Sequence, residues 1–182
     1  MIEDAGSYPF GAEIRAALAA TRPMSGDPDF AGYHGTSLWA LIYAAKFGAL
    51  PNRSPRDRLF YYLPRDYPDA LEEAKQYALN NSTIHFVREF VPYATIDDVY
   101  AALDRGDANA ESTVEGVIEE ALGLRGVVIS LGRSVADLRA AEAPVNERCI
   151  HVPRGGLPVK HIRHAQPLGP RDREILGDRG LI

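Results

Sequence analysis

The sequence has a single cysteine, no excess of positive charge and no apolar run long enough to cross a bilayer. One cysteine, Cys149, excludes an internal disulfide framework and fits a reducing compartment. The 20 Lys and Arg against 25 Asp and Glu give a net charge of −5, whereas non-specific duplex binding needs a basic surface. The longest apolar run, 38–45, is too short for a membrane span, and the acidic start at Glu3 and Asp4 is unlike a signal peptide. We therefore expect a soluble protein without a membrane partner, cytoplasmic or delivered into the cytosol of a target cell.

The length and the amino-acid composition of the chain are typical of one globular domain. The chain has 182 residues, of which 46% are hydrophobic and 25% charged, and its 13 Pro and 16 Gly indicate many turns. Within this single domain we expect an N-terminal helical extension (1–30), a catalytic core (31–165) and a charged tail (166–182).

Helical and strand patterns alternate along the chain without a regular βαβ order, which favours an α+β fold. Ser37 is a candidate N-cap for a helix that Gly48 would end. The other expected helices are 10–21, 69–79, 96–103, 114–122 and 135–141; the expected strands are 32–36, 59–63, 83–91, 126–131, 147–152 and 157–162.

A first motif that could carry chemistry lies where an expected strand becomes a helix, at His34, Gly35 and Thr36. His34 and Thr36 can hydrogen-bond ribose hydroxyls or phosphate oxygens, and Gly35 has no side chain to keep a ligand from the backbone. The segment also fits a plain turn.

Tyrosines and one carboxylate complete the candidate set. Tyr61 and Tyr62 are adjacent in a strand, so one faces the core and the other the opposite surface. Tyr77 follows in the last turn of an expected helix, and Glu147 lies at the start of an apolar strand. A tyrosine ring offers a flat face for a pyridine or purine, although core packing explains each tyrosine equally well.

Together, the order and spacing of Tyr33-His34-Gly35-Thr36, Tyr61-Tyr62-Leu63-Pro64 and Glu147 resemble the ADP-ribosyltransferase superfamily. The similarity is to its His-Tyr-Glu branch, which includes diphtheria-toxin-like and poly(ADP-ribose)-polymerase-like enzymes. The resemblance implies a split, two-sheet NAD-binding fold with peripheral helices. It also implies transfer of ADP-ribose from NAD to a protein, nucleic-acid or small-molecule acceptor, with NAD hydrolysis as a side reaction.

The resemblance also implies a role for each residue. His34 would bind the adenosine ribose, with Gly35 and Thr36 supporting the same loop or ribose. Tyr62, or Tyr61 in its place, and Tyr77 would sandwich the nicotinamide. The expected NAD-binding residues are thus His34, Gly35, Thr36, Tyr61, Tyr62 and Tyr77. Glu147 would be the catalytic carboxylate beside the nicotinamide ribose, with His34 as its catalytic companion. No metal is implied.

Three other interpretations remain open. An RNA 2′-phosphotransferase would share the general fold and NAD and would draw on nearby arginines, of which the chain has Arg53, Arg56, Arg58 and Arg65. A zinc site could use ligand-capable side chains, namely Cys149, His151, His161 and His164. A non-catalytic interaction module could use the polar stretch 104–112 as a binding loop.

Overall fold

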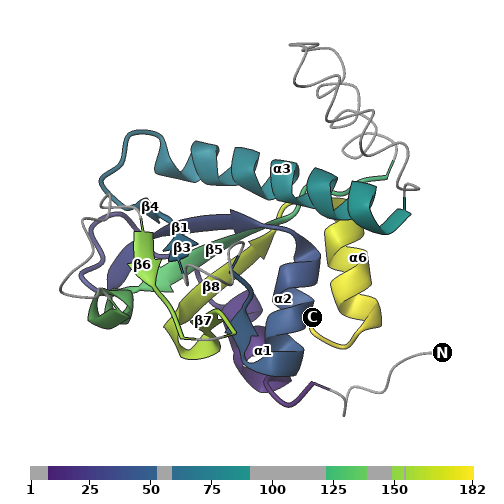
Figure 1. Ribbon diagram of the computed structural model, residues 1–182, viewed down its shortest axis with the longest axis horizontal. Coiled ribbons are helices and arrows are strands. Elements are labelled where there is room, and N and C mark those ends of the chain that lie inside the picture. Colours follow the sequence, from purple (N-terminus) through teal and green to yellow (C-terminus); the bar gives the residue numbers. More distant parts are fainter. Residues whose placement is uncertain (1–7, 53–58, 91–121, 139–148, 154) are drawn as a thin grey trace.

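The computed structural model describes residues 8–52, 59–90, 122–138, 149–153 and 155–182 (Figure 1). Its helical elements are α1 (Gly11–Ala19), α2 (Leu38–Phe47), α3 (Ala70–Phe90), η3 (Arg133–Leu138), η4 (Val159–His161) and α6 (Pro170–Asp178). Its strands are β1 (Phe30–Thr36), β2 (Ala49–Leu50), β3 (Leu59–Tyr61), β4 (Leu63–Pro64), β5 (Val127–Gly132), β6 (Cys149–His151), β7 (Leu157–Pro158) and β8 (Ile162–Pro167). The α+β class expected from the sequence is confirmed.

The central element is a four-stranded antiparallel sheet in the order β4-β1-β5-β8. Two short antiparallel ribbons accompany it, β2 with β7 and β3 with β6. The pairing aligns Tyr33 of β1 with Ser130 of β5, and Ser130 in turn with His164 of β8. Side chains of these three residues therefore belong to the same face of the sheet.

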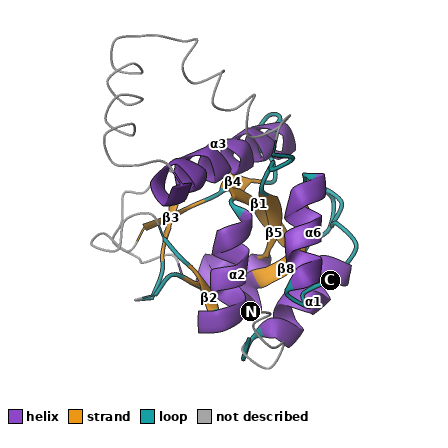
Figure 2. Cartoon of the chain, turned by 90° about the vertical axis from the view of Figure 1, so that its right-hand side faces the viewer, coloured by secondary structure: helices purple, strands orange, loops and turns teal. Residues whose placement is uncertain are grey.

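The two faces of the sheet are covered differently (Figure 2). Helix α3 crosses one face, where its Ala70, Ala74 and Ala78 pack against Phe30 and Tyr33 of β1. Helices α1, α2 and α6 contribute to the larger core on the other face, which includes Val127, Ile129 and Leu131 of β5. The small alanine side chains let the backbone of α3 approach β1 closely, including the end of β1 that carries His34, Gly35 and Thr36.

Local sequence signals set the ends of α2. The Ser37 hydroxyl accepts a hydrogen bond from the Ala40 N–H, which satisfies one of the free donors at the helix start. Gly48 ends the helix in the left-handed conformation, with φ of 78°. Both residues are the caps that the sequence predicts.

The strand expected at 83–91 is wrong, because the described part of this segment, up to Phe90, continues helix α3. Its alternating pattern is typical of a strand, but the hydroxyls of Ser82 and Thr83 donate to the carbonyls of Ala78 and Leu79 one turn earlier. The polar side chains are thereby accommodated within the helix.

Other segments differ in extent. The helix expected at 135–141 is described only to residue 138, as the 3-10 helix η3. The segment 157–162 forms β7 and η4 before β8 begins. Residues 166–182, expected as a charged tail, contain the end of β8 and helix α6, whose Asp172 and Leu176 are buried. The helix expected at 96–103 lies outside the described residues, as does the helix expected at 114–122 except for its last residue.

None of the helices in the described part of the chain is both long and apolar enough to cross a membrane.

Candidate functional site

The candidate site lies where the chain passes from one sheet to another. Strand β4 pairs with β1 through Gly32–Pro64 and Tyr33–Leu63, and the described pairing ends there. One residue earlier in the chain, Tyr62 separates β4 from β3, and β3 pairs with β6 instead. The end of β1, with His34, Gly35 and Thr36, therefore lies beside an interruption between two sheets.

His34 connects the two sides of this interruption. Its Nδ1 lies 2.8 Å from the carbonyl oxygen of Tyr61, and its ring packs against Phe60 with centroids 4.3 Å apart. Because a carbonyl oxygen only accepts, Nδ1 must carry the hydrogen. In the neutral ring, Nε2 is then a hydrogen-bond acceptor.

The environment of His34 keeps the ring neutral. Burial lowers its pKa from 6.5 to about 4, and the hydrogen bond to Tyr61 opposes this effect only in part. At this half-buried position the positive charge of the protonated ring would lose part of its hydration, which disfavours protonation. At neutral pH the structure therefore presents His34 as an uncharged imidazole with one fixed tautomer.

Gly35 is needed for helix packing. A Cβ atom added to it would overlap the Ala74 carbonyl oxygen and lie 2.7 Å from the Ala78 nitrogen, both in α3. The Gly35 carbonyl accepts a hydrogen bond of 3.0 Å from the Asn81 side chain. The close approach that the sequence predicts at Gly35 is thus made by the protein's own helix on this face.

Thr36 is buried at the end of β1, directly before the α2 N-cap. It pairs with Val127 at the start of β5. Its position ties the His34 segment to the sheet and to α2.

The three candidate tyrosines differ in exposure. Tyr61 is 56% exposed and Tyr77, on α3, is 45% exposed, whereas Tyr62 is only 6% exposed and packs in the larger core. Of the adjacent pair, Tyr61 therefore has the larger exposed surface, whereas Tyr62 belongs to the core.

The predicted catalytic carboxylate, Glu147, lies outside the described residues. The strand that follows it is described, and its Cys149 pairs with Tyr61. The sequence neighbourhood of Glu147 therefore leads into the ribbon that contains the exposed tyrosine.

The residues of the other interpretations are only partly described. Arg53, Arg56, Arg58 and the stretch 104–112 lie outside the described residues. Arg65 donates to the carbonyls of Asp27 and Phe30, so it anchors the loop before β1.

The side chains of Cys149 and His151 are also outside the described set. Across the part of the chain that the structure describes, no three His, Cys, Asp or Glu side chains gather as metal ligands. His161 and His164 instead make separate hydrogen bonds, His161 to Ser134 at 2.8 Å and His164 to Ser130 at 3.3 Å.

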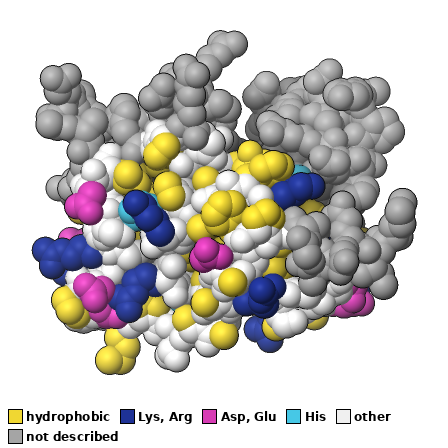
Figure 3. All heavy atoms as spheres, turned by 90° about the horizontal axis from the view of Figure 1, so that it is seen from below, with side chains coloured by type: hydrophobic (Ala, Val, Ile, Leu, Met, Phe, Trp, Pro, Cys, Tyr) yellow, Lys and Arg dark blue, Asp and Glu magenta, His cyan; other side chains and the backbone are white. Residues whose placement is uncertain are grey.

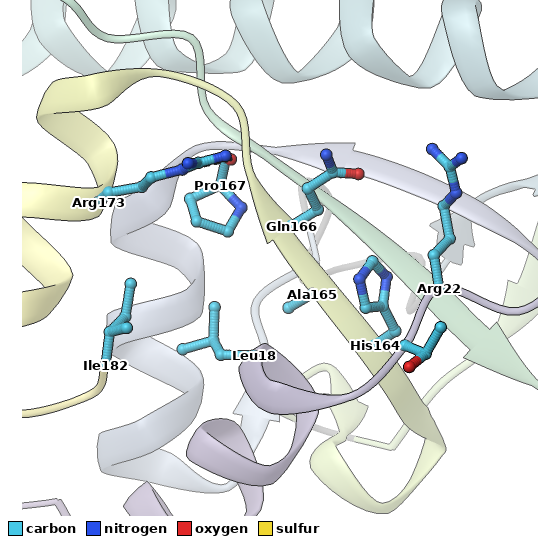
Figure 4. A pocket seen from close by; sticks show the side chains of 9 residues that line it. Leu18, Arg22, His164, Ala165, Gln166, Pro167, Arg173 and Ile182 are labelled. Carbon is cyan, nitrogen blue, oxygen red and sulfur yellow. Dashed lines mark hydrogen bonds between the residues drawn. The ribbon is translucent and has the colours of Figure 1, made fainter.

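A second polar region, which the sequence does not predict, lies at the edge strand β8 (Figure 4). A cavity of about 560 Å³ is lined there by residues from both ends of the chain: Leu18, Thr21, Arg22, His164, Ala165, Gln166, Pro167, Arg173 and Ile182. Arg22 and His164 are so far apart in sequence that no local motif could have indicated their proximity.

The surface seen in Figure 3 carries interspersed basic, acidic and hydrophobic side chains. On that face the described residues form no continuous basic surface, in agreement with the net charge of −5.

No family model, no curated protein and no solved structure matches this chain.

Proposed function

We propose that the protein is an NAD-dependent ADP-ribosyltransferase whose NAD site lies at the interruption between the two sheets. The observation that carries this proposal is the His34 imidazole, fixed by the Tyr61 carbonyl at 2.8 Å beside an exposed tyrosine. The order of the motifs in the sequence supports the same assignment, as does an α+β fold with separate sheets.

His34 would bind a ribose of NAD. Its Nδ1–H is engaged by Tyr61, so Nε2 can accept a hydrogen bond from a ribose hydroxyl. A neutral ring suits this role, because an imidazolium has no acceptor. The lowered pKa of His34 keeps the acceptor available at neutral pH.

Tyr61 would provide the stacking face for the nicotinamide ring, with Tyr77 as the second aromatic side chain. Both rings have exposed surface, and an aromatic contact of this type contributes about 1 kcal/mol beyond the area that it buries. Tyr62 would support the strand from the core, where its ring is buried.

Glu147 would act on the reacting ribose. The bond between C1′ and the nicotinamide nitrogen breaks, nicotinamide leaves as a neutral molecule, and C1′ gains the bond to the acceptor nucleophile. As in glycoside cleavage, positive charge develops on the ribose, and a nearby carboxylate stabilises it. The same carboxylate can receive the proton that the nucleophile loses.

The experiment is to incubate the protein with NAD labelled in the adenylate part, with and without a cell lysate, and to measure nicotinamide release and label transfer. Glu147→Gln should lower both rates by roughly 100-fold or more, as the loss of transition-state electrostatic stabilisation does elsewhere. Glu174→Gln is the control, because Glu174 is an exposed residue of α6 paired with Arg171. Rates that Glu147→Gln leaves unchanged would refute the catalytic assignment.

A second pair of variants separates binding from chemistry. Tyr61→Ala removes the ring but keeps the backbone carbonyl that orients His34, so NAD should bind this variant more weakly than the wild type. Tyr62→Phe should leave the affinity for NAD near that of the wild type. Equal affinity of NAD for the wild type and Tyr61→Ala, measured by calorimetry, would exclude the stacking role.

A further inference from the structure

The cavity at β8 lies apart from the proposed NAD site. Strand β5 separates β1, which carries His34, from β8, which lines the cavity. The volume of about 560 Å³ is within the range of pockets that take small molecules, roughly 300–1,000 Å³. Its lining residues come from α1, the loop after α1, β8, α6 and Ile182.

The charged side chains that line the cavity are all basic. Arg22 and Arg173 line it, and no Asp or Glu does so among the described residues. Within the part of the chain that the structure describes, Arg22 makes no ion pair or hydrogen bond, whereas Arg173 donates to the Pro167 carbonyl through Nε and Nη2. In a protein of net charge −5, two arginines without a carboxylate mark a local site for negative charge.

His164 adds a buried polar group beside Arg22. Its Nδ1 is bonded to the Ser130 hydroxyl at 3.3 Å, and its Nε2 has no hydrogen-bond partner in the described residues. A hydroxyl can donate or accept, so Ser130 permits the tautomer in which Nε2 carries the hydrogen. His164 can therefore donate a hydrogen bond to a ligand in the cavity.

The other side chains give the cavity an apolar part. Figure 4 shows Arg173, Gln166 and Arg22 in a row, with Leu18 and Ile182 below them. Leu18 and Ala165 would contact a hydrocarbon or aromatic group, and the Gln166 amide adds a donor to the polar row.

We propose that this cavity binds a small organic anion, with its phosphate or carboxylate group between Arg22 and His164 and its apolar group against Ala165 and Leu18. The charge-assisted hydrogen bond from Arg22 anchors the anion, and burial of the apolar group adds affinity. The site is independent of NAD turnover at His34.

The test uses the full chain, with phenyl phosphate, benzoate and inorganic phosphate as probes. Binding is followed by calorimetry and by the NMR signals of the His164 ring. Phenyl phosphate should bind and shift the His164 signals, and Arg22→Gln should weaken it about tenfold or more, because one charge-assisted hydrogen bond is lost. Arg171→Gln is the matched control, since Arg171 lies two residues from Arg173 but pairs with Glu174 outside the cavity.

Benzoate separates the two anion classes. Tighter binding of phenyl phosphate than of benzoate assigns the site to phosphates, and the reverse order assigns it to carboxylates. Inorganic phosphate should bind more weakly than phenyl phosphate, because it lacks the group that contacts the apolar side chains.

Three results would overturn the proposal. The first is that neither phenyl phosphate nor benzoate binds at millimolar concentration. The second is that Arg171→Gln and Arg22→Gln lose affinity for phenyl phosphate equally. The third is that the NMR signals of His164 stay unchanged when the protein is saturated with the probe. Displacement of the probe by NAD would contradict the independence of the two sites.

Discussion

The two histidines on the two sides of strand β5 show how a hydrogen-bond partner determines what an imidazole can do. His34 is bonded to a carbonyl oxygen, which fixes the hydrogen on Nδ1 and leaves Nε2 as an acceptor. His164 is bonded to a hydroxyl, which is compatible with either tautomer. The first ring suits a ligand that donates, such as a ribose hydroxyl, and the second can donate to an anion.

The two regions also differ in how tightly neighbouring elements pack against their strands. At β1, helix α3 contacts the backbone at Gly35 so tightly that no Cβ would fit. At β8, the edge strand borders a cavity of about 560 Å³. We therefore expect substitutions near β1 to change stability more than substitutions at the β8 edge.

The largest effect should come from Gly35→Ala. The added methyl group overlaps the Ala74 carbonyl, which is backbone and cannot rotate away, so α3 must move from β1. We expect a loss of at least about 3 kcal/mol in the free energy of unfolding, measured by urea denaturation. Gly177→Ala is the control, because its Cβ meets nothing within 4 Å; equal losses in the two variants would show that α3 does not constrain Gly35.

The next largest effect should come from Asp172, which joins α6 to the start of β5. One carboxylate oxygen accepts from the N–H groups of Arg125, Gly126 and Gly169 at 2.7, 2.9 and 3.1 Å. Asp172→Ala leaves these donors unpaired and should cost about 3 kcal/mol. Asp172→Asn keeps an acceptor oxygen, so its loss of stability should be clearly smaller. Similar losses of stability for both variants would show that the three hydrogen bonds to Asp172 do not stabilise the fold.

A pH-dependent effect should come from His34. Its pKa falls from 6.5 to about 4 in the folded state, so its contribution to stability is present above pH 6.5 and is lost as the pH falls towards 4. The expected loss is about 2 kcal/mol, allowing for partial exposure of the ring.

The measurement requires the Asp172→Asn background. Burial raises the pKa of Asp172 from 3.8 to about 6, so its contribution is present below about pH 4 and is lost as the pH rises through 6, the opposite direction. Urea denaturation of this variant between pH 7 and 4 should show the His34 effect, and adding His34→Gln should remove it. An unchanged pH profile after that second substitution would assign the effect to another group.

The smallest effect should come from Ser130→Ala at the β8 side. It removes one neutral hydrogen bond to His164 and should cost about 1 kcal/mol, measured by thermal denaturation. The nitrogen shifts of His164 should change in this variant while those of His34 stay fixed. A change at His34 of equal size would show that the two regions are coupled.

Local patterns predicted the parts of the fold that depend on neighbouring residues. Ser37 and Gly48 predicted both ends of α2, and the apolar run before Gly132 predicted β5 with an error of one residue at each end. The continuation of α3 through 83–90 could not be predicted from alternation, because the same residues fit a helix once Ser82 and Thr83 bond to their own helix.

The sequence by itself determined the α+β class, the caps of α2 and the set of chemically capable residues around His34 and Tyr61. Only the tertiary structure decided that Tyr61 rather than Tyr62 is exposed, that Gly35 contacts α3, and that Arg22 and His164 line one cavity. The physical reason is that propensity, capping and periodicity act over a few residues, whereas exposure and proximity depend on how distant segments pack.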